Sequence, residues 1–402
     1  MSKVAMRASF QRRDWLLLSF IFVMALSLRG PVVGIAPLID VVEPSLHLSS
    51  SASGLLTTLP ILAFALCAPL ATLLGRRYGL ELALLLGSIT IAIGIMLRSV
   101  NALPSLYLGV TLVGVGIAIG NVLLPILLKR DFPNRILQLT AIYVLMMNLG
   151  GAFMTGLAVP VAQWAPTWLP QLAGWSSALL SHLIFILPAL ALWFFIPKHQ
   201  TVTGPASYAP TPMWRSPLAW IITLFLALDS VLNYIVNAWI PTILAAKGYD
   251  AATAGLYHSY IQTAGMIPAL ALPLLKRYFG SPRQLTSIAI LATLASLLGF
   301  AFAPAVSALW SFLFGFGCTL GFVMGLSLIS LRTASVHEAA ALSGMAQLVG
   351  YLMAAAGPVT IGALFDWTQD WQYPLYVLIG IVLVWAIIGW FASAQKSEHR
   401  SI

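Results

Sequence analysis

Two charged side chains lie in the middle of long apolar stretches, where a charge is costly. Arg29 stands in the run Leu28-Arg29-Gly30-Pro31, about halfway along the first stretch, and Asp229 lies near the middle of the seventh. Insertion scales put this cost at about 2.5–3.5 kcal/mol, so such residues usually have a function. Because the guanidinium is a planar set of donors that stays charged, Arg29 is predicted to bind an anionic or strongly electronegative substrate. A structural ion pair or a helix-end contact is the alternative.

Asp229 begins a polar stripe within its apolar stretch. Asn233 and Asn237 follow it at i+4 and i+8, which puts the three side chains on one helical face. Lipid cannot satisfy such a face, so it must meet water or another polar helix. Aligning the two halves of the chain brings Arg29 to the level of Asn233. Asp229 then has three open interpretations: it pairs with Arg29, it carries a proton, or it is hydrogen-bonded within its own half.

Other polar residues repeat at helical spacing in further apolar stretches. Ser343, Gln347 and Tyr351 share one face, and His258 and Gln262 share another. Each amide alone is equally consistent with an interhelical hydrogen bond, and His258 alone with a structural histidine. As a group they predict a binding site. Its substrate ligands would be Arg29, Asn121, Asn148, Asn233, Asn237, His258, Gln262, Gln347 and Tyr351, with Asp229 as the proton-coupling candidate.

The composition shows which kind of element must position these residues. Of 402 residues, 60% are hydrophobic and 8% are charged, against about 25% charged in soluble domains. Too few polar residues remain to cover a soluble globule, which excludes a soluble enzyme and a disordered chain. There is no phosphate-binding GxxxxGK[ST] loop, metal-ligand spacing or Ser-His-Asp set. We therefore expect a membrane protein that is not an enzyme and needs no cofactor or metal.

Twelve apolar stretches are long enough to span a bilayer as helices, which needs about 20 residues. They run near 15–39, 52–74, 80–98, 103–128, 138–163, 174–196, 217–245, 251–275, 284–303, 306–331, 339–365 and 373–394.

The basic residues predict the orientation of these spans. With a cytoplasmic N-terminus, 17 of the 20 Lys and Arg residues face the cytoplasm, and Arg29, Arg98 and Lys247 remain. Loop Lys and Arg determine topology, so both termini are predicted to be cytoplasmic and the net charge of +9 to reflect anchoring rather than nucleic-acid binding. Arg98 is expected to close the third span at the outer interface and reach water.

An internal repeat divides the chain into two halves. Gly54, Gly114 and Arg76 have counterparts 201 residues later, at Gly255, Gly315 and Arg277. The polar stretch 198–216 is typical of a flexible linker. We therefore predict an all-α membrane protein of twelve transmembrane helices in two pseudo-symmetric six-helix bundles, 1–197 and 217–402, joined by the linker 198–216. This is the architecture of the major facilitator fold.

Two basic loops occupy equivalent cytoplasmic turns, with Arg76 and Arg77 in one and Lys276 and Arg277 in the other. Arginines at a helix C-terminus favour its negative end, so capping is one interpretation. A latch that stabilises one conformational state is an equally open one.

Several motifs carry a family resemblance. The loop Gly75-Arg76-Arg77-Tyr78-Gly79 resembles the cytoplasmic signature of the major facilitator superfamily, with Arg76 where an aspartate is usual. The remaining motifs are Leu28-Arg29, Ala36-Pro37-Leu38-Ile39-Asp40, Gly54-Leu55-Leu56-Thr57-Thr58-Leu59-Pro60, Gly120-Asn121-Val122-Leu123-Leu124-Pro125 and Ala341-Leu342-Ser343-Gly344-Met345-Ala346-Gln347. Together they resemble the cyanate permease and 2-nitroimidazole transporter family, and are more similar to the 2-nitroimidazole branch.

The resemblance implies a monomeric secondary transporter of the bacterial inner membrane. Its substrate would be a small, polar or anionic nitrogen-containing compound, moved by alternating access. Export of a 2-nitroimidazole-like compound, with possible coupling to protons, is the prediction. Uptake of cyanate or another small anion is the alternative, and a non-transporting receptor is a more remote one.

Overall fold

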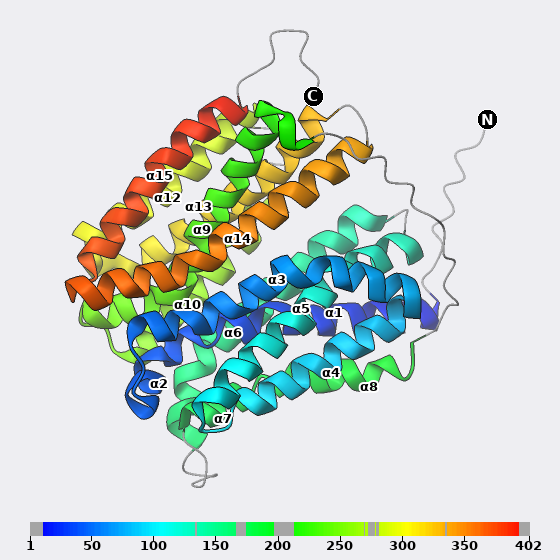
Figure 1. Cartoon of the computed structure of the whole chain (residues 1–402), viewed down its shortest axis with the longest axis horizontal. Coiled ribbons are helices and arrows are strands. Elements are labelled where there is room, and N and C mark those ends of the chain that lie inside the picture. The colour runs from blue at the N-terminus through cyan, green and yellow to red at the C-terminus, as the bar shows by residue number, and fades with distance from the viewer. Residues whose placement is uncertain are drawn as a thin grey trace.

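The long apolar stretches form helices packed in two bundles (Figure 1). The computed structural model describes residues 11–132, 135–165, 174–196, 213–268, 270–271, 278, 281–333 and 336–393. The first bundle consists of α1 (Arg12–Val33), η1 (Ala36–Leu38), α2 (Ile39–Leu46), α3 (Ser50–Tyr78), α4 (Leu80–Arg98), α5 (Leu103–Asp131), α6 (Ile136–Trp164), α7 (Gly174–Leu180) and α8 (Leu183–Trp193). The second consists of α9 (Pro217–Ala246), α10 (Ala251–Ala264), α12 (Pro282–Phe302), η5 (Pro304–Val306), α13 (Ser307–Arg332), α14 (Val336–Thr368) and α15 (Gln372–Ser393), preceded by η4 (Met213–Arg215).

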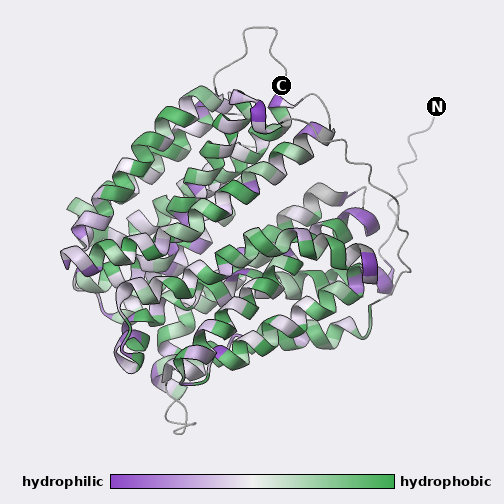
Figure 2. Ribbon diagram, viewed as in Figure 1, coloured by the Kyte–Doolittle hydropathy of each residue, from purple (hydrophilic) through white to green (hydrophobic). Residues whose placement is uncertain are grey.

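Eleven segments among the described residues are long and apolar enough to cross a membrane. The all-helical architecture predicted from the sequence is thereby confirmed, and the ribbon coloured by hydropathy shows hydrophobic residues along most helices (Figure 2). The expected eighth span begins with α10, but much of 269–280 lies outside the described residues. The linker predicted at 198–216 is described only from 213 onward.

Two expected spans differ in detail from single straight helices. The first continues past α1 through η1 and α2 to Leu46, turning at Gly34 and Ile35. The sixth is interrupted between α7 and α8, at Ser181 and His182. Pro31 lies inside the last turn of α1. Although proline removes a backbone donor, the helix continues past Arg29 and Pro31 and ends at Val33.

The internal repeat reappears as equivalent helix contacts. A side chain at Gly114 in α5 would collide with Pro60 of α3, and one at Gly315 in α13 would collide with Ile261 of α10. Both members of the second pair lie 201 residues after the first. The matched glycines therefore mark the same close helix approach in each bundle.

The two bundles meet through α3 against α14 and through α6 against α10. Thr58 Oγ1 donates to the Ala355 carbonyl at 2.7 Å. The backbone N–H groups of Ser50 and Ser51 donate to the Asp366 carboxylate at 3.0 and 2.9 Å. These contacts lie toward the first residues of α3 and the last residues of α14, and we call this region the closed end.

Candidate functional site

A cavity of about 530 Å³ lies between the bundles at the middle of the helices. Seven helices contribute to it, namely α1, α3, α5, α6, α9, α13 and α14. The polar and aromatic residues that line it are Arg29, Phe64, Asn121, Tyr143, Asn148, Asp229, Ser230, Asn233, Tyr234, Thr319, Phe322, Gln347 and Tyr351. Seven of the ten predicted site residues therefore line one cavity.

Arg29 projects into this cavity from α1 and contacts the opposite bundle. Its Nε donates to Gln262 Oε1 of α10 at 2.6 Å. Gly150 of α6 allows α1 to approach closely, because a side chain there would meet the backbone of Leu26. Within the described part of the chain, neither terminal nitrogen of Arg29 has a hydrogen-bond partner. Those two nitrogens are free to bind an acceptor in the cavity.

A hydrogen-bonded series of side-chain amides in the second bundle fixes the acceptor of Arg29 in position. Gln262 Nε2 donates to Asn237 Oδ1, and Asn237 Nδ2 donates to the Asn233 carbonyl at 2.8 Å and to Asn233 Oδ1. His258 Nε2 lies 3.0 Å from the same Asn237 Oδ1. Arginine can only donate, so Gln262 Oε1 must be the acceptor and the orientation of each following amide is fixed. Asn237 Oδ1 is then an acceptor, and His258 carries its hydrogen on Nε2.

Three predicted substrate ligands thus have a different location from the one expected. Asn237, His258 and Gln262 are 4%, 0% and 1% exposed and are not among the residues that line the cavity. They hold Arg29 and Asn233 in position. The N-terminus of α10, the helix that carries two of them, is capped by Asp250, whose carboxylate accepts from Thr253 N at 3.0 Å. This bond and the one from the Thr253 hydroxyl lower the pKa of Asp250.

Asp229 does not pair with Arg29 in this conformation. The salt bridges found among the described residues join Arg130 to Glu81 and Asp131, and none involves Asp229. Cys318 Sγ lies 3.5 Å from Asp229 Oδ1, and Asp229 Oδ2 is buried without a hydrogen-bond partner. Of the three interpretations, the ion pair is therefore not formed.

The remaining predicted ligands lie around the cavity wall. Asn121 Oδ1 accepts from the Tyr143 hydroxyl at 3.3 Å, and Asn148 of α6 is buried and lines the same cavity. Gln347 Nε2 donates to Ser343 Oγ at 3.2 Å, which confirms that this stripe forms one face of α14.

The sequence analysis predicted Tyr351 but missed the other members of the aromatic wall of the cavity. The Tyr351 ring lies edge-on to Phe64 at 5.8 Å and to Tyr234 at 6.4 Å between centroids. Tyr143 and Phe322 complete the wall. In sequence, an aromatic residue in an apolar span cannot be told from a core or lipid-facing residue. For Tyr234, the one indication of a place in the cavity wall was that it directly follows Asn233.

Arg98 is a correction to the sequence analysis. It is 1% exposed, and its Nη1 donates to the Pro31 carbonyl at 2.5 Å, so it does not reach water as expected. Sequence position gives the depth of a residue in the membrane, but not which way its helix face turns. Here the face turns toward the C-terminal turn of α1, whose carbonyls attract a cation.

The predicted basic latch is described only in part. Arg77 is exposed and its guanidinium lies 5.4 Å from the Tyr78 ring, and the helix ends at Gly79 with φ 93° as a glycine cap predicts. The Arg76 side chain, Lys276 and Arg277 lie outside the described residues. The latch stays a prediction.

Two helical bundles around a polar cavity are the architecture of multi-pass membrane transporters of small molecules. The sequence profile of the Major Facilitator Superfamily matches residues 15–358, and the chain belongs to that family. It is 40% identical to a 2-nitroimidazole transporter of Escherichia coli (strain K12) over 388 residues, covering 94% of this chain and 96% of the relative. It is 24% identical to a cyanate transport protein of the same organism over 92% of this chain and 96% of the relative.

The fold matches solved transporters. The crystal structure of a D-xylose–proton symporter superposes with a TM-score of 0.80 at 14% identity, covering 97% of this chain and 100% of the symporter. At that identity, the likeness concerns the fold alone. The resemblance to the 2-nitroimidazole and cyanate transporter family read from the sequence is confirmed.

Proposed function

We propose that this protein is a secondary active transporter of a small, planar, nitrogen-containing compound that is anionic or carries an electronegative group such as a nitro group. It works as a monomer in the bacterial inner membrane by alternating access. The relation to a 2-nitroimidazole transporter supports this substrate class. The proposal rests above all on Arg29.

The single observation that carries the proposal is the way Arg29 is held. Its Nε is occupied by Gln262 at 2.6 Å, while its two terminal nitrogens have no partner among the described residues. A guanidinium held by one nitrogen presents the other two as a fork, which matches the paired oxygens of a nitro group or carboxylate. Arg29 is therefore the main substrate ligand, with Asn121, Asn148 and Gln347 as further polar contacts.

The dimensions of the cavity favour a ring over cyanate, the alternative substrate. Small-molecule sites usually measure about 300–1,000 Å³, and this one measures about 530 Å³. Three tyrosines and two phenylalanines line it, and their faces suit stacking on a flat ring. A linear anion of three heavy atoms would use Arg29 and leave the aromatic wall without a role.

Asp229 is the proposed proton carrier. It lines the cavity, yet its Oδ2 has no partner and it forms no ion pair among the described residues. An unpaired carboxylate is costly to bury, so a group that gains and releases a proton between states suits this position. Transport is then coupled to the proton gradient.

The conformation is proposed to be open toward the cytoplasm. The hydrogen bonds described between the bundles lie on the side of the closed end. Arg12, at the start of α1, and Ser393, at the end of α15, lie at the opposite end of the molecule. The excess of Lys and Arg on the side of the termini supports a cytoplasmic location for that side. The closed end is then the outer end.

The test is transport of 2-nitroimidazole in proteoliposomes, in both directions, with binding measured in parallel. Arg29→Ala should weaken binding about 10- to 100-fold, because a hydrogen bond to a charged group contributes about 1.5–3 kcal/mol. Arg29→Lys keeps the charge but loses the planar fork, so it should rescue binding only in part. The matched control is Arg12→Ala, an exposed arginine on the same helix.

Three results would contradict the proposal. Wild-type transport by Arg29→Ala would remove Arg29 as the ligand. Transport of cyanate but not of the nitroimidazole would favour the alternative substrate. Binding without flux in either direction would identify a receptor.

A further inference from the structure

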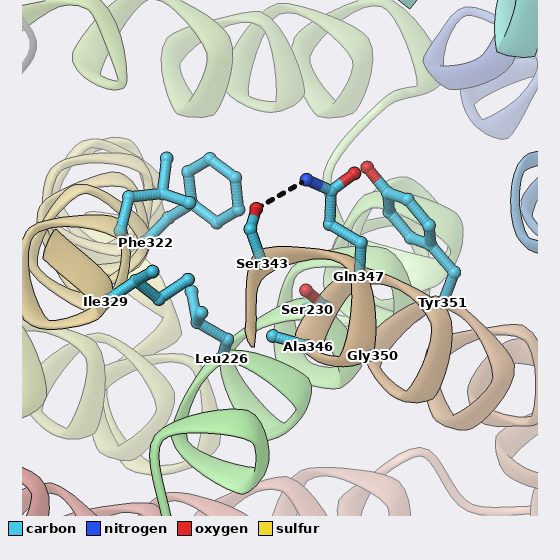
Figure 3. Close-up of a pocket in the computed structure, with 10 residues that line it drawn as sticks. Leu226, Ser230, Phe322, Ile329, Ser343, Ala346, Gln347, Gly350 and Tyr351 are labelled. Carbon is cyan, nitrogen blue, oxygen red and sulfur yellow. Dashed lines mark hydrogen bonds between the residues drawn. The ribbon is translucent and has the colours of Figure 1, made fainter. Parts of the chain in front are cut away.

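A small side pocket opens beside the central cavity within the second bundle (Figure 3). It lies between α9, α13 and α14, and it shares Ser230, Phe322, Gln347 and Tyr351 with the cavity. The two spaces are therefore neighbours with a common wall. A molecule held in the cavity by Arg29 can extend a group into the side pocket.

The walls of the pocket determine which group fits. Leu226, Phe322 and Ile329 form an apolar side, while Ser343 and Gln347 are already bonded to each other at 3.2 Å (Figure 3). No charged residue is among those that line it. Most of the lining is apolar, and Ser343 and Gln347 already bond each other, so the pocket favours an apolar substituent over one that must give up water.

The size of the pocket limits that group to a short one. The space open to the centres of water-sized groups is only about 20 Å³ here, against about 530 Å³ in the central cavity, so a short group suits it better than a bulky one. A methyl group fits, and a bulky branched chain does not. Gly350 lines this space, and a Cβ added there would lie 3.9 Å from Ser230 Oγ, another lining residue, and 3.6 Å from Ala227 Cα.

We infer that this side pocket is a substrate subsite for a methyl-sized apolar substituent on the ring, and that Gly350 determines its specificity. The inference rests on the proposed function and refines its substrate class. The preferred substrate is a ring with an electronegative group at Arg29 and a short alkyl group between α9, α13 and α14.

The experiment compares 2-nitroimidazole with its 1-methyl and 4-methyl derivatives, by calorimetry on the purified full-length protein. For the wild type we expect at least one derivative to bind about fourfold more tightly than the parent compound, since a buried CH₂ contributes about 0.8 kcal/mol. Gly350→Ala fills the space and should bring that ratio to one or below. The added Cβ makes only ordinary contacts, so the variant is expected to fold.

Gly344→Ala is the matched control. It makes the same substitution in the same helix and hence the same gain in helix propensity, but a Cβ at Gly344 meets nothing within 4 Å and the residue does not line the pocket. It should keep the wild-type ratio.

The outcomes separate the subsite from the proposed function. If the parent binds in an Arg29-dependent way but neither derivative gains affinity, or if Gly350→Ala keeps the gain, the subsite is wrong and the function stands. If the parent does not bind at all, the proposed function fails and the subsite fails with it.

Discussion

The closed end depends on a helix cap that one bundle supplies to the other. The first donors of α3 are satisfied from two sources: Ser49 accepts from Ala52 N and Ser53 N, and Asp366 of α14 accepts from Ser50 N and Ser51 N. The Asp366 bonds are lost whenever the bundles separate here. We therefore predict that replacing Asp366 shifts the protein toward the state open at this end.

The size of the shift follows from this geometry. Loss of a capping side chain costs about 0.5–2 kcal/mol, and a carboxylate at a helix N-terminus adds about 0.3–1 kcal/mol. Asp366 is half-buried, which keeps the expected total near 1–2 kcal/mol. Asp366→Ala should therefore lower the ratio of closed to open molecules about 5- to 30-fold. Asp366→Asn retains one acceptor oxygen, so its effect on the ratio of closed to open molecules should be nearer fivefold.

The assay is a distance distribution between spin labels at Val41 and Val306. These residues are 45% and 50% exposed and lie near the closed end of different bundles. Cys67→Ala and Cys318→Ser remove the two native thiols. The control is Asp370→Asn, which removes a charge four residues away whose carboxylate caps Gln372 N at 2.8 Å within its own bundle. Equal shifts in Asp366→Asn and Asp370→Asn, or none in Asp366→Ala, would refute the cross-bundle cap.

Two further predictions concern charges buried in the helices. Asp229→Asn should abolish substrate-driven proton movement in proteoliposomes while substrate exchange continues, and unchanged proton movement would exclude Asp229 as the carrier. Arg98→Ala removes the 2.5 Å bond to Pro31 and leaves a cavity, so it should lower the free energy of unfolding by about 3 kcal/mol or more. Arg77→Ala, at an exposed site, should change it by less than about 0.5 kcal/mol; equal thermal melting of the two variants would contradict the role given to Arg98.

The fold could be predicted from the sequence because lipid imposes a strong constraint. Only helices satisfy their own backbone in a bilayer, so apolar runs translate into helices. The repeat then pairs them, as Gly114 on Pro60 and Gly315 on Ile261 show. The break between α7 and α8 and the extension from η1 into α2 were not predicted, because hydropathy does not report local turns.

The candidate site was predicted in part. Polar residues at helical spacing in an apolar span had to turn inward, and Arg29, Asn121, Asn148, Asn233 and Gln347 line one cavity, although their role as ligands stays a prediction. Their partners were not predictable, because pairing across the bundles depends on how far one bundle is rotated against the other. Alignment of the halves put Arg29 at the level of Asn233 and left an ion pair with Asp229 open, whereas the close approach of α6 and α10 brings Gln262 to Arg29.

The hydrogen bond between Arg29 and Gln262 joins the two bundles. Arg29 belongs to the first bundle and Gln262 to the second, so their bond is one of those that must break when the closed end opens. Gln262 is neutral, and separating it from Arg29 costs less than separating a buried ion pair with Asp229 would. Arg29 can therefore move away from α10 without leaving an opposite charge unpaired. On the proposed function, a substrate bound to its terminal nitrogens would stay with the first bundle, and the proposed proton carrier Asp229 would stay with the second.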